Sequence, residues 1–272
     1  MVSPHRLGQL LERAGESLPA ADPAVRACGL WSVTLVGSLA RDDFRPGGSD
    51  VDLLVVHQCG DLLSDEVGKR TDVRAVVRHF GEPLLQLTGG SGVQGAFVVD
   101  CHFVDLEVLR GQPHWAAPDR FLPTRTRHDR FLWIYCFDLV AHSRLLWGEN
   151  PTALVHPHDP LPYIPTAARE LARRVAELSA GTGESHALAD LVDRWKAAAG
   201  ELMALLALAH DCRSLRKQDL HRTFNTRVPY FPGKDFAASL WAECLYGTVF
   251  QERDEWVARC ARFCESGLTL LR

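Results

Sequence analysis

The fold is decided by residues 30–57, which read L-W-S-V-T-L-V-G-S-L-A-R-D-D-F-R-P-G-G-S-D-V-D-L-L-V-V-H. Two short apolar runs, residues 30–36 and 53–56, flank a loop rich in Asp, Arg, Pro and Gly. Runs of this length that are rich in Val, Leu and Trp are typical of buried β-strands. We therefore predict two neighbouring strands joined by a polar loop.

Asp50 and Asp52 stand where the second apolar run begins. Residues i and i+2 of a strand point to the same face, so the two carboxylates are predicted to lie side by side. Two close carboxylates without a counter-charge repel each other and lose hydration. Mg²⁺ relieves that cost, and proteins usually hold it with one or two carboxylates plus substrate phosphates. The pair therefore predicts a cation site.

Gly37 and Ser38 directly follow the first apolar run. A glycine after a strand lets the backbone approach a ligand closely. Backbone N–H groups and a hydroxyl at such a turn are suited to phosphate oxygens. A turn for phosphate beside an acidic pair for a cation predicts phosphoryl or nucleotidyl transfer.

The segment G-S-L-A-R at 37–41, followed by S-D-V-D-L-L-V-V at 49–56, resembles the signature of the polymerase-beta-like nucleotidyltransferase superfamily. Within it the chain looks most like the small-molecule members, the aminoglycoside- and lincosamide-type enzymes. The resemblance covers residues 1–115 and implies two divalent metal ions with a third acid on a later strand. The chain departs from the pattern at Asp42-Asp43, where relatives often have Gly. This departure puts the role that the resemblance implies for the neighbouring Arg41 in question.

The resemblance also implies site residues and cofactors. Mg²⁺, as two ions, would be held by Asp50, Asp52 and the third acid. The co-substrate would be an NTP, with ATP as the first expectation. The implied nucleotide contacts come from Gly37, Ser38, Arg41, Ser49 and, in the second half of the chain, Lys196.

The third acid is expected within residues 93–109, a segment that carries a third predicted strand. Asp100 lies inside the apolar run, where a charge needs a partner or a metal. Asp105 lies nearer the end and can be explained as a solvated residue. We prefer Asp100, because the first acid of this pattern resembles the family's catalytic one, and keep Asp105 as the alternative. His102 is predicted to be a partly exposed strand residue.

The predicted fold class is α+β, with a nucleotidyltransferase fold of mixed sheet and flanking helices at 1–115 and an all-α domain at 116–272. The resemblance implies that this helical domain forms the other wall of the cleft. Lys196 would reach the triphosphate there, and a solvated lysine is the alternative. Helices are predicted at 3–17, 22–29, 61–80 (ended by Gly81-Glu82-Pro83), 128–147, 166–180, 185–209, 214–224, 235–246 and 249–265.

Charge argues against a nucleic-acid partner. The net charge is −4; residues 1–115 carry 10 Lys or Arg against 15 Asp or Glu, and the remainder 20 against 19. Nucleic-acid-binding proteins usually show a basic excess, so a small acceptor, including a cationic one, is favoured. No apolar run is long enough for a bilayer span, and the N-terminus lacks a signal-peptide core. The eight cysteines show no C-x-x-C pair, which favours a reducing cytoplasm.

These features predict a Mg-dependent enzyme that moves NMP from an NTP to a hydroxyl of an antibiotic- or amino-sugar-like molecule, with release of pyrophosphate. An antibiotic-resistance role follows from the same resemblance. The general base is left open among Asp100, Glu107, Glu149 and Glu170. The alternatives are an antitoxin-type transferase directed at a protein or tRNA, and a non-catalytic NTP-binding regulatory module. A homodimer is a further option that the resemblance implies.

Overall fold

The computed structural model describes residues 3–20, 29–44, 49–58, 71–87, 99–110, 139–154, 164–181, 188–240 and 253–271. The chain forms two compact units, Met1–His158 and Asp159–Arg272. The first unit thus extends beyond the boundary predicted at residues 115 and 116.

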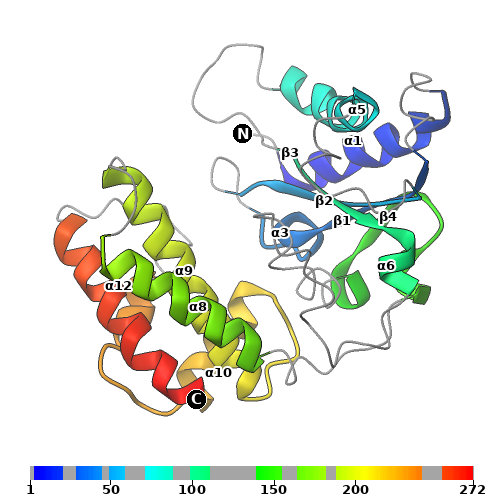
Figure 1. Cartoon of the computed structure of the whole chain (residues 1–272). Coiled ribbons are helices and arrows are strands. Elements are labelled where there is room, and N and C mark those ends of the chain that lie inside the picture. The colour runs from blue at the N-terminus through cyan, green and yellow to red at the C-terminus, as the bar shows by residue number, and fades with distance from the viewer. Residues whose placement is uncertain are drawn as a thin grey trace. The chain divides into compact units, whose positions relative to one another are not determined.

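A four-stranded mixed sheet forms the centre of the first unit (Figure 1). The strand order is β3-β2-β1-β4, with β2 and β3 parallel and the other two pairs antiparallel. The predicted α+β class is confirmed. The strands are β1 (Leu30–Val36), β2 (Val51–His57), β3 (Val99–Asp105) and β4 (Arg144–Gly148).

The two faces of the sheet pack against different helices, because successive side chains of a strand alternate. On one face, Leu35 and Leu53 pack in a core with residues of helices α1 (Pro4–Ser17) and α5 (Thr71–Leu87), which lie on the same side of the sheet in Figure 1. On the other face, a second core contains Leu54, Val56 and Val104 together with Leu106 and Leu109 of α6 (Leu106–Arg110). Asp52 is two residues before Leu54, so it belongs to the α6 side of the sheet.

Helix α1 begins as predicted. Ser3 is the N-cap, its Oγ accepts a hydrogen bond from the backbone N–H of Arg6 at 3.3 Å, and Pro4 is the first helical residue. The helix packs closely on β4 at Gly15. A Cβ there would lie 2.2 Å from the backbone oxygen of Leu146. A short 3-10 helix, Leu18–Ala20, follows.

Helix α5 continues through Pro83 to Leu87, so the predicted stop at residues 81–83 is wrong. A proline inside a helix removes one backbone hydrogen bond and disfavours the turn before it. Here tertiary packing outweighs that loss, because Val76, Phe80 and Leu84 are fully buried in the core. Residues 61–70 of that predicted helix, and the one predicted at 22–29, lie outside the described residues except Gly29.

Strand β4 corrects the prediction of one long helix over residues 128–147. Helical structure is found at residues 139–142, and Arg144–Gly148 is a strand paired with β1. Residues 128–138 lie outside the description. The sequence R-L-L-W-G has no strict alternation, and its strand conformation depends on the hydrogen-bonding edge that β1 offers.

The second unit contains helices joined by turns and no strand among its described residues, whereas the all-α domain predicted at 116–272 also includes the strand β4. Helix α9 packs against α8, α10 and α12. The helices of the second unit are α8 (Ile164–Ser179), α9 (Leu188–Ala209), α10 (Lys217–Arg227) and α12 (Arg253–Leu268), with a further helical segment at 236–240. The 3-10 helix η7 (Thr269–Leu271) follows α12. Another 3-10 helix, η5 (Pro151–Leu154), belongs to the first unit. The core contains an aromatic cluster made of Phe224, Phe231, Phe236, Phe263 and Trp256.

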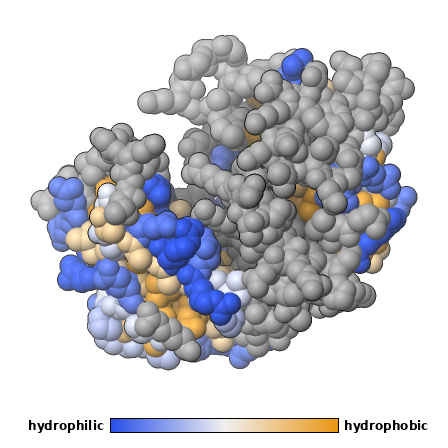
Figure 2. Space-filling view, in the orientation of Figure 1, coloured by the Kyte–Doolittle hydropathy of each residue, from blue (hydrophilic) through white to orange (hydrophobic). Residues whose placement is uncertain are grey.

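On the face seen in Figure 2, the described residues of the second unit form hydrophilic areas with apolar areas between them. Tyr230, at 72% exposure, is the most exposed large hydrophobic residue in the described part of the chain. No helix within the described ranges is long and apolar enough to cross a membrane.

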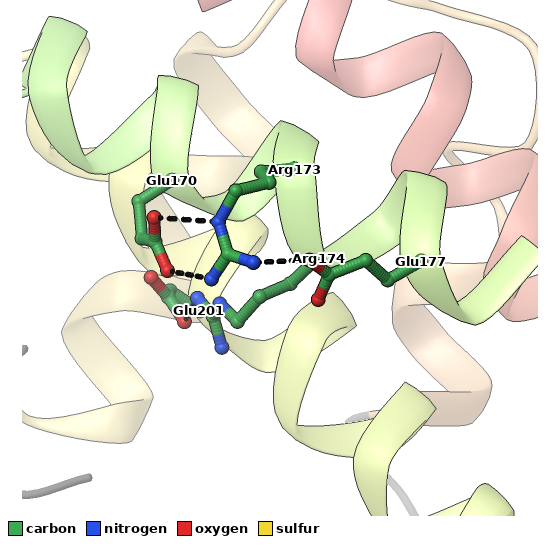
Figure 3. A network of polar contacts seen from close by, with 5 residues as sticks. All are labelled: Glu170, Arg173, Arg174, Glu177 and Glu201. Carbon is green, nitrogen blue, oxygen red and sulfur yellow. Dashed lines mark hydrogen bonds and ion pairs between the residues drawn. The ribbon is translucent and has the colours of Figure 1, made fainter. Parts of the chain in front are cut away.

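Ion pairs join and cover the helices of the second unit (Figure 3). Arg174 of α8 pairs with Glu201 of α9, and both side chains are largely buried. Arg173 extends from α8 toward solvent and pairs with Glu170, at 2.6 Å, and with Glu177. One pair therefore links two helices, whereas the other two lie along one exposed helix face.

Candidate active site

The Gly-Ser half of the motif lies directly after β1. Gly37 begins the helical turn α3 (Gly37–Ala40) with φ at +70°, a conformation that glycine adopts without strain. A Cβ at this position would lie 1.9 Å from Oδ2 of Asp52. The contact follows from the antiparallel register, in which Val36 pairs with Asp52. The two halves of the sequence motif therefore pack against each other.

Ser38 follows Gly37 and is buried, with 7% of its surface exposed. Its Oγ has no hydrogen-bond partner among the residues that the structure describes. A buried hydroxyl without a partner costs about 1–3 kcal/mol, so such groups generally imply a ligand, an ion or a water. Ser38 is thus well suited to hold a polar ligand group beside Asp52.

Asp50 and Asp52 lie at the beginning of β2. Asp50 precedes the strand and is exposed, whereas Asp52 is its second residue and is partly buried between the buried Val51 and Leu53. A carboxylate in this position is open to a ligand on one side and packed on the other. Ser49, partly buried, directly precedes Asp50.

The two candidates for the third acid lie at opposite ends of β3. In the parallel ladder Asp100 is the register partner of Asp52, whereas Asp105 is the partner of His57. Asp105 Oδ2 lies 3.8 Å from His57 Nδ1. Five residues of strand separate the two acids, a distance of about 16 Å. The backbone thus favours Asp100 as the acid beside Asp52, and the side chain of Asp100 lies outside the description.

His102 corrects the sequence analysis, which gave this residue no role at the site. The prediction of a partly exposed side chain is wrong, because His102 is buried at 7% exposure. Its Nε2 lies 3.5 Å from Oδ1 of Asp52. The signal in the sequence was its spacing of two from Asp100, which places both on one face of the strand pattern.

Acidic residues in the loop after α3 are engaged by arginines. Arg41 Nε lies 3.4 Å from Asp43 Oδ2, and both side chains are mostly buried. Asp42 has a positive φ of 63° and lies 3.5 Å from Nη2 of Arg144 on β4. Asp42-Asp43, the departure from the family pattern, thus supplies partners for two arginines. A nucleotide contact from Arg41 stays a prediction.

The remaining candidates belong to other elements of the chain. Lys196 lies partly buried on α9 in the second unit, and its role stays a prediction. Among the possible bases, Glu149 is exposed after β4, and Glu170 is bound by Arg173. The side chain of Glu107 lies outside the description.

A metal site can be tested only through the described side chains, and these contain no group of three or more His, Cys, Asp or Glu that could hold an ion. The predicted third member, Asp100, is not among them. What is described fits a hard cation. Asp52 presents a partly exposed carboxylate, and the register places Asp100 beside it. Carboxylate oxygens are the protein ligands that Mg²⁺ prefers.

Comparison with known families agrees with this geometry. Residues 29–86 match the family model described as a nucleotidyltransferase domain. The matched segment contains β1, the Gly37-Ser38 turn, the Asp50–Asp52 pair and most of α5. A comparison with curated proteins found no match for the chain.

The chain therefore carries a nucleotidyltransferase domain, consistent with the polymerase-beta-like superfamily. The protein is a transferase of the nucleotidyltransferase type.

Proposed function

We propose that the protein transfers a nucleoside monophosphate from an NTP, ATP as the first expectation, to a hydroxyl of a small molecule, with release of pyrophosphate. The observation that supports this most directly is the packing of Gly37 on the carboxylate of Asp52. Within the matched domain, this packing brings a turn suited to bind phosphate into contact with a carboxylate suited to bind a cation.

The residues have separate roles in this proposal. Gly37 allows the backbone to approach the distal phosphates, and the Ser38 hydroxyl, for which the described residues offer no partner, donates a hydrogen bond to a phosphate oxygen. Asp50, Asp52 and Asp100 would hold Mg²⁺. When bound, the ions supply charge stabilisation on the attacking and leaving oxygens. Asp100 or a glutamate accepts the proton of the acceptor hydroxyl.

The acceptor is proposed to be an antibiotic- or amino-sugar-like compound. The support is charge: residues 1–115 carry five more acidic than basic side chains, and a cationic amino sugar is attracted to such a surface. A resistance function in the cytoplasm is part of the same proposal. A protein- or tRNA-directed transferase is the rival, and it would require activity that depends on a macromolecular partner.

Calorimetry tests the nucleotide site. Wild-type protein should bind one NTP in the presence of Mg²⁺, and Asp50→Asn and Asp52→Asn should each lose that binding. Asp105→Asn is the matched control, because this acid lies at the far end of β3 beside His57. A variant at Asp52 that kept full Mg²⁺-dependent turnover would overturn the assignment.

Pyrophosphate release tests the acceptor class. With the NTP that calorimetry identifies, release should require an amino-sugar compound from a broad panel of small hydroxyl acceptors. Release that instead requires a co-purified protein or tRNA would favour the rival. Tight NTP binding without release under either condition would indicate a regulatory module.

A further inference from the structure

We propose that His102 is a positioning residue for Asp52: its Nε2–H donates a hydrogen bond to Oδ1 and fixes the carboxylate in the orientation that the metal ion requires. The inference rests on the proposed function, in which Asp52 is a metal ligand. It adds a residue that neither the motif nor the family match includes, since the match ends at residue 86.

The sheet itself brings His102 to Asp52. Asp52 pairs with Asp100 across the parallel ladder, and His102 pairs with Leu54. His102 is therefore the diagonal neighbour of Asp52 on the same face, a separation that a long side chain can bridge. The side chain does so: Nε2 lies 3.5 Å from Oδ1, longer than the roughly 2.7–3.2 Å of most N–H···O hydrogen bonds.

The two side chains of this contact differ in how deeply they are buried. The His102 side chain is 8% exposed and is held by the protein around it, whereas the Asp52 side chain keeps 22% of its surface open. An ionised carboxylate can only accept hydrogen bonds, so Nε2 must be the donor in this pair. A fixed donor beside a partly open carboxylate orients it without blocking access.

Gly37 restrains the other oxygen of the same carboxylate. The space that its missing Cβ leaves is occupied by Asp52 Oδ2, which would be 1.9 Å from such an atom. Asp52 is thus bounded by His102 at Oδ1 and by Gly37 at Oδ2. Hydrogen-bonded partners of metal-ligating side chains typically contribute 10- to 100-fold, roughly, to metal affinity or activity.

His57 provides a matched control within the same sheet. It is also a buried histidine, 3% exposed, at the end of the neighbouring strand, and its acidic partner is Asp105 rather than Asp52. A purely structural role predicts similar effects of the two histidines. A positioning role predicts that only His102 affects the metal.

Mn²⁺ binding by the full-length protein, followed by electron paramagnetic resonance without nucleotide, is the first test. His102→Ala should raise the Mn²⁺ dissociation constant by about 10- to 100-fold. His102→Gln should restore much of the affinity, because its amide Nε2–H can occupy the donor position. His57→Ala should leave the dissociation constant unchanged while lowering the melting temperature. Circular dichroism confirms that each variant is folded.

Nitrogen NMR of the imidazole gives a readout that does not depend on metal. In wild-type protein the His102 signal, assigned through its absence in His102→Gln, should show a proton on Nε2, and Asp52→Asn should shift that signal. The His57 signal should not change in Asp52→Asn.

The outcomes separate the two proposals. If Asp52→Asn loses Mn²⁺ but His102→Ala binds it like wild type, the positioning role is wrong and the proposed function stands. If His102→Ala weakens Mn²⁺ binding and His102→Gln binds as weakly, donation from Nε2 is wrong. If wild-type protein binds neither Mn²⁺ nor Mg-NTP, the proposed function fails and this inference fails with it.

Discussion

At the scale of single residues, Gly37 is the position where the least chemical change should have the largest effect. Gly37→Ala would place a Cβ on the Asp52 carboxylate and hold alanine at a φ of +70°. Backbone strain of this kind costs about 1–3 kcal/mol. Displacing a catalytic group by an ångström lowers turnover about a hundredfold. We therefore expect a lower melting temperature and the loss of nearly all NTP turnover.

Gly200→Ala is the control for this substitution. Gly200 lies inside α9, and a Cβ there would meet nothing within 4 Å. Alanine is favoured over glycine in a helix by about 0.8–1 kcal/mol, so this variant should be slightly more stable and fully active. Equal activity of the two variants would show that Gly37 does not support the site.

The pKa of the buried Cys264 thiol predicts how the free energy of unfolding changes with pH. Burial, followed by the nearby Glu265 and Glu201, raises the pKa of its thiol to about 12 from 9.0. The folded state therefore favours the protonated thiol. Its stabilising contribution is complete below pH 9, and it is lost as the pH rises from 9 toward 12, because the unfolded chain ionises first.

Urea unfolding of wild type and Cys264→Ala at pH 8 and pH 10 measures this pH-dependent contribution of Cys264 to the free energy of unfolding. Removing the thiol leaves a small cavity at both pH values, so only the change between them reports ionisation. One pH unit above the unfolded pKa corresponds to about 1.4 kcal/mol. The wild type should lose that much of its advantage at pH 10, and a constant difference would contradict the assignment.

The proximity of single residues was predictable where they belong to one local motif, while their roles stay predictions. Gly37, Ser38, Asp50 and Asp52 form a local motif, and the structure places Gly37 against Asp52. His102 could not be found in this way, because its contact depends on the register between two strands. Periodicity specifies the face of a residue within its strand but not its neighbour across the ladder.

At the scale of elements, the ion pairs of the second unit differ in what they hold together. Arg174 and Glu201 join α8 to α9, with side chains 17% and 12% exposed. Arg173 and Glu170 lie along α8 and are 51% and 37% exposed. Solvent screens the exposed pair, whereas removing one partner of the enclosed pair takes a counter-charge away from a largely buried ion.

Double-mutant cycles to alanine measure both pairs. The coupling energy of Arg173 with Glu170 should be within about 0.2–1 kcal/mol. The single variants Arg174→Ala and Glu201→Ala should each cost more, up to about 3 kcal/mol, with a clearly larger coupling. High salt should weaken the first coupling much more than the second. Equal couplings would mean that the contact between α8 and α9 does not depend on this pair.

Elements were predictable where local pattern and tertiary packing agree. Helix α1 has a cap, a first-turn proline and an apolar face, and β1 and β2 are short apolar runs. The two misassigned segments are those where distant contacts decide. Helix α5 passes through Pro83 because Leu84, directly after it, is buried in the core, and Arg144–Gly148 becomes β4 because it pairs with the edge of β1.

At the scale of the whole molecule, the chain consists of two units with separate cores. The sheet and its helices form the first, and the aromatic cluster around Phe263 lies in the second. All described residues of the nucleotidyltransferase motif belong to the first unit. The metal site is therefore proposed to be complete without the second unit, whose predicted contribution is to the nucleotide and the acceptor.

Substitution of Lys196 tests whether the second unit contributes to nucleotide binding but not to metal binding. It lies partly buried on α9, two residues after the exposed Arg194. If its ammonium group binds the triphosphate, Lys196→Met should raise KM for the NTP about tenfold or more, because a hydrogen bond to a charged group contributes about 1.5–3 kcal/mol. Mn²⁺ binding without nucleotide should not change, since the proposed metal ligands lie in the first unit.

Arg194→Met is the control, because it removes the same charge from the same helix at an exposed position. Comparing KM for the NTP in the two variants tests whether the effect is specific to Lys196. If Lys196→Met and Arg194→Met raise KM equally, the second unit acts on the nucleotide only through its general charge. If neither changes KM, Lys196 is a solvated lysine whose stem packs on the helix surface. A selective effect of Lys196 on KM would instead show that both units contribute to one nucleotide site.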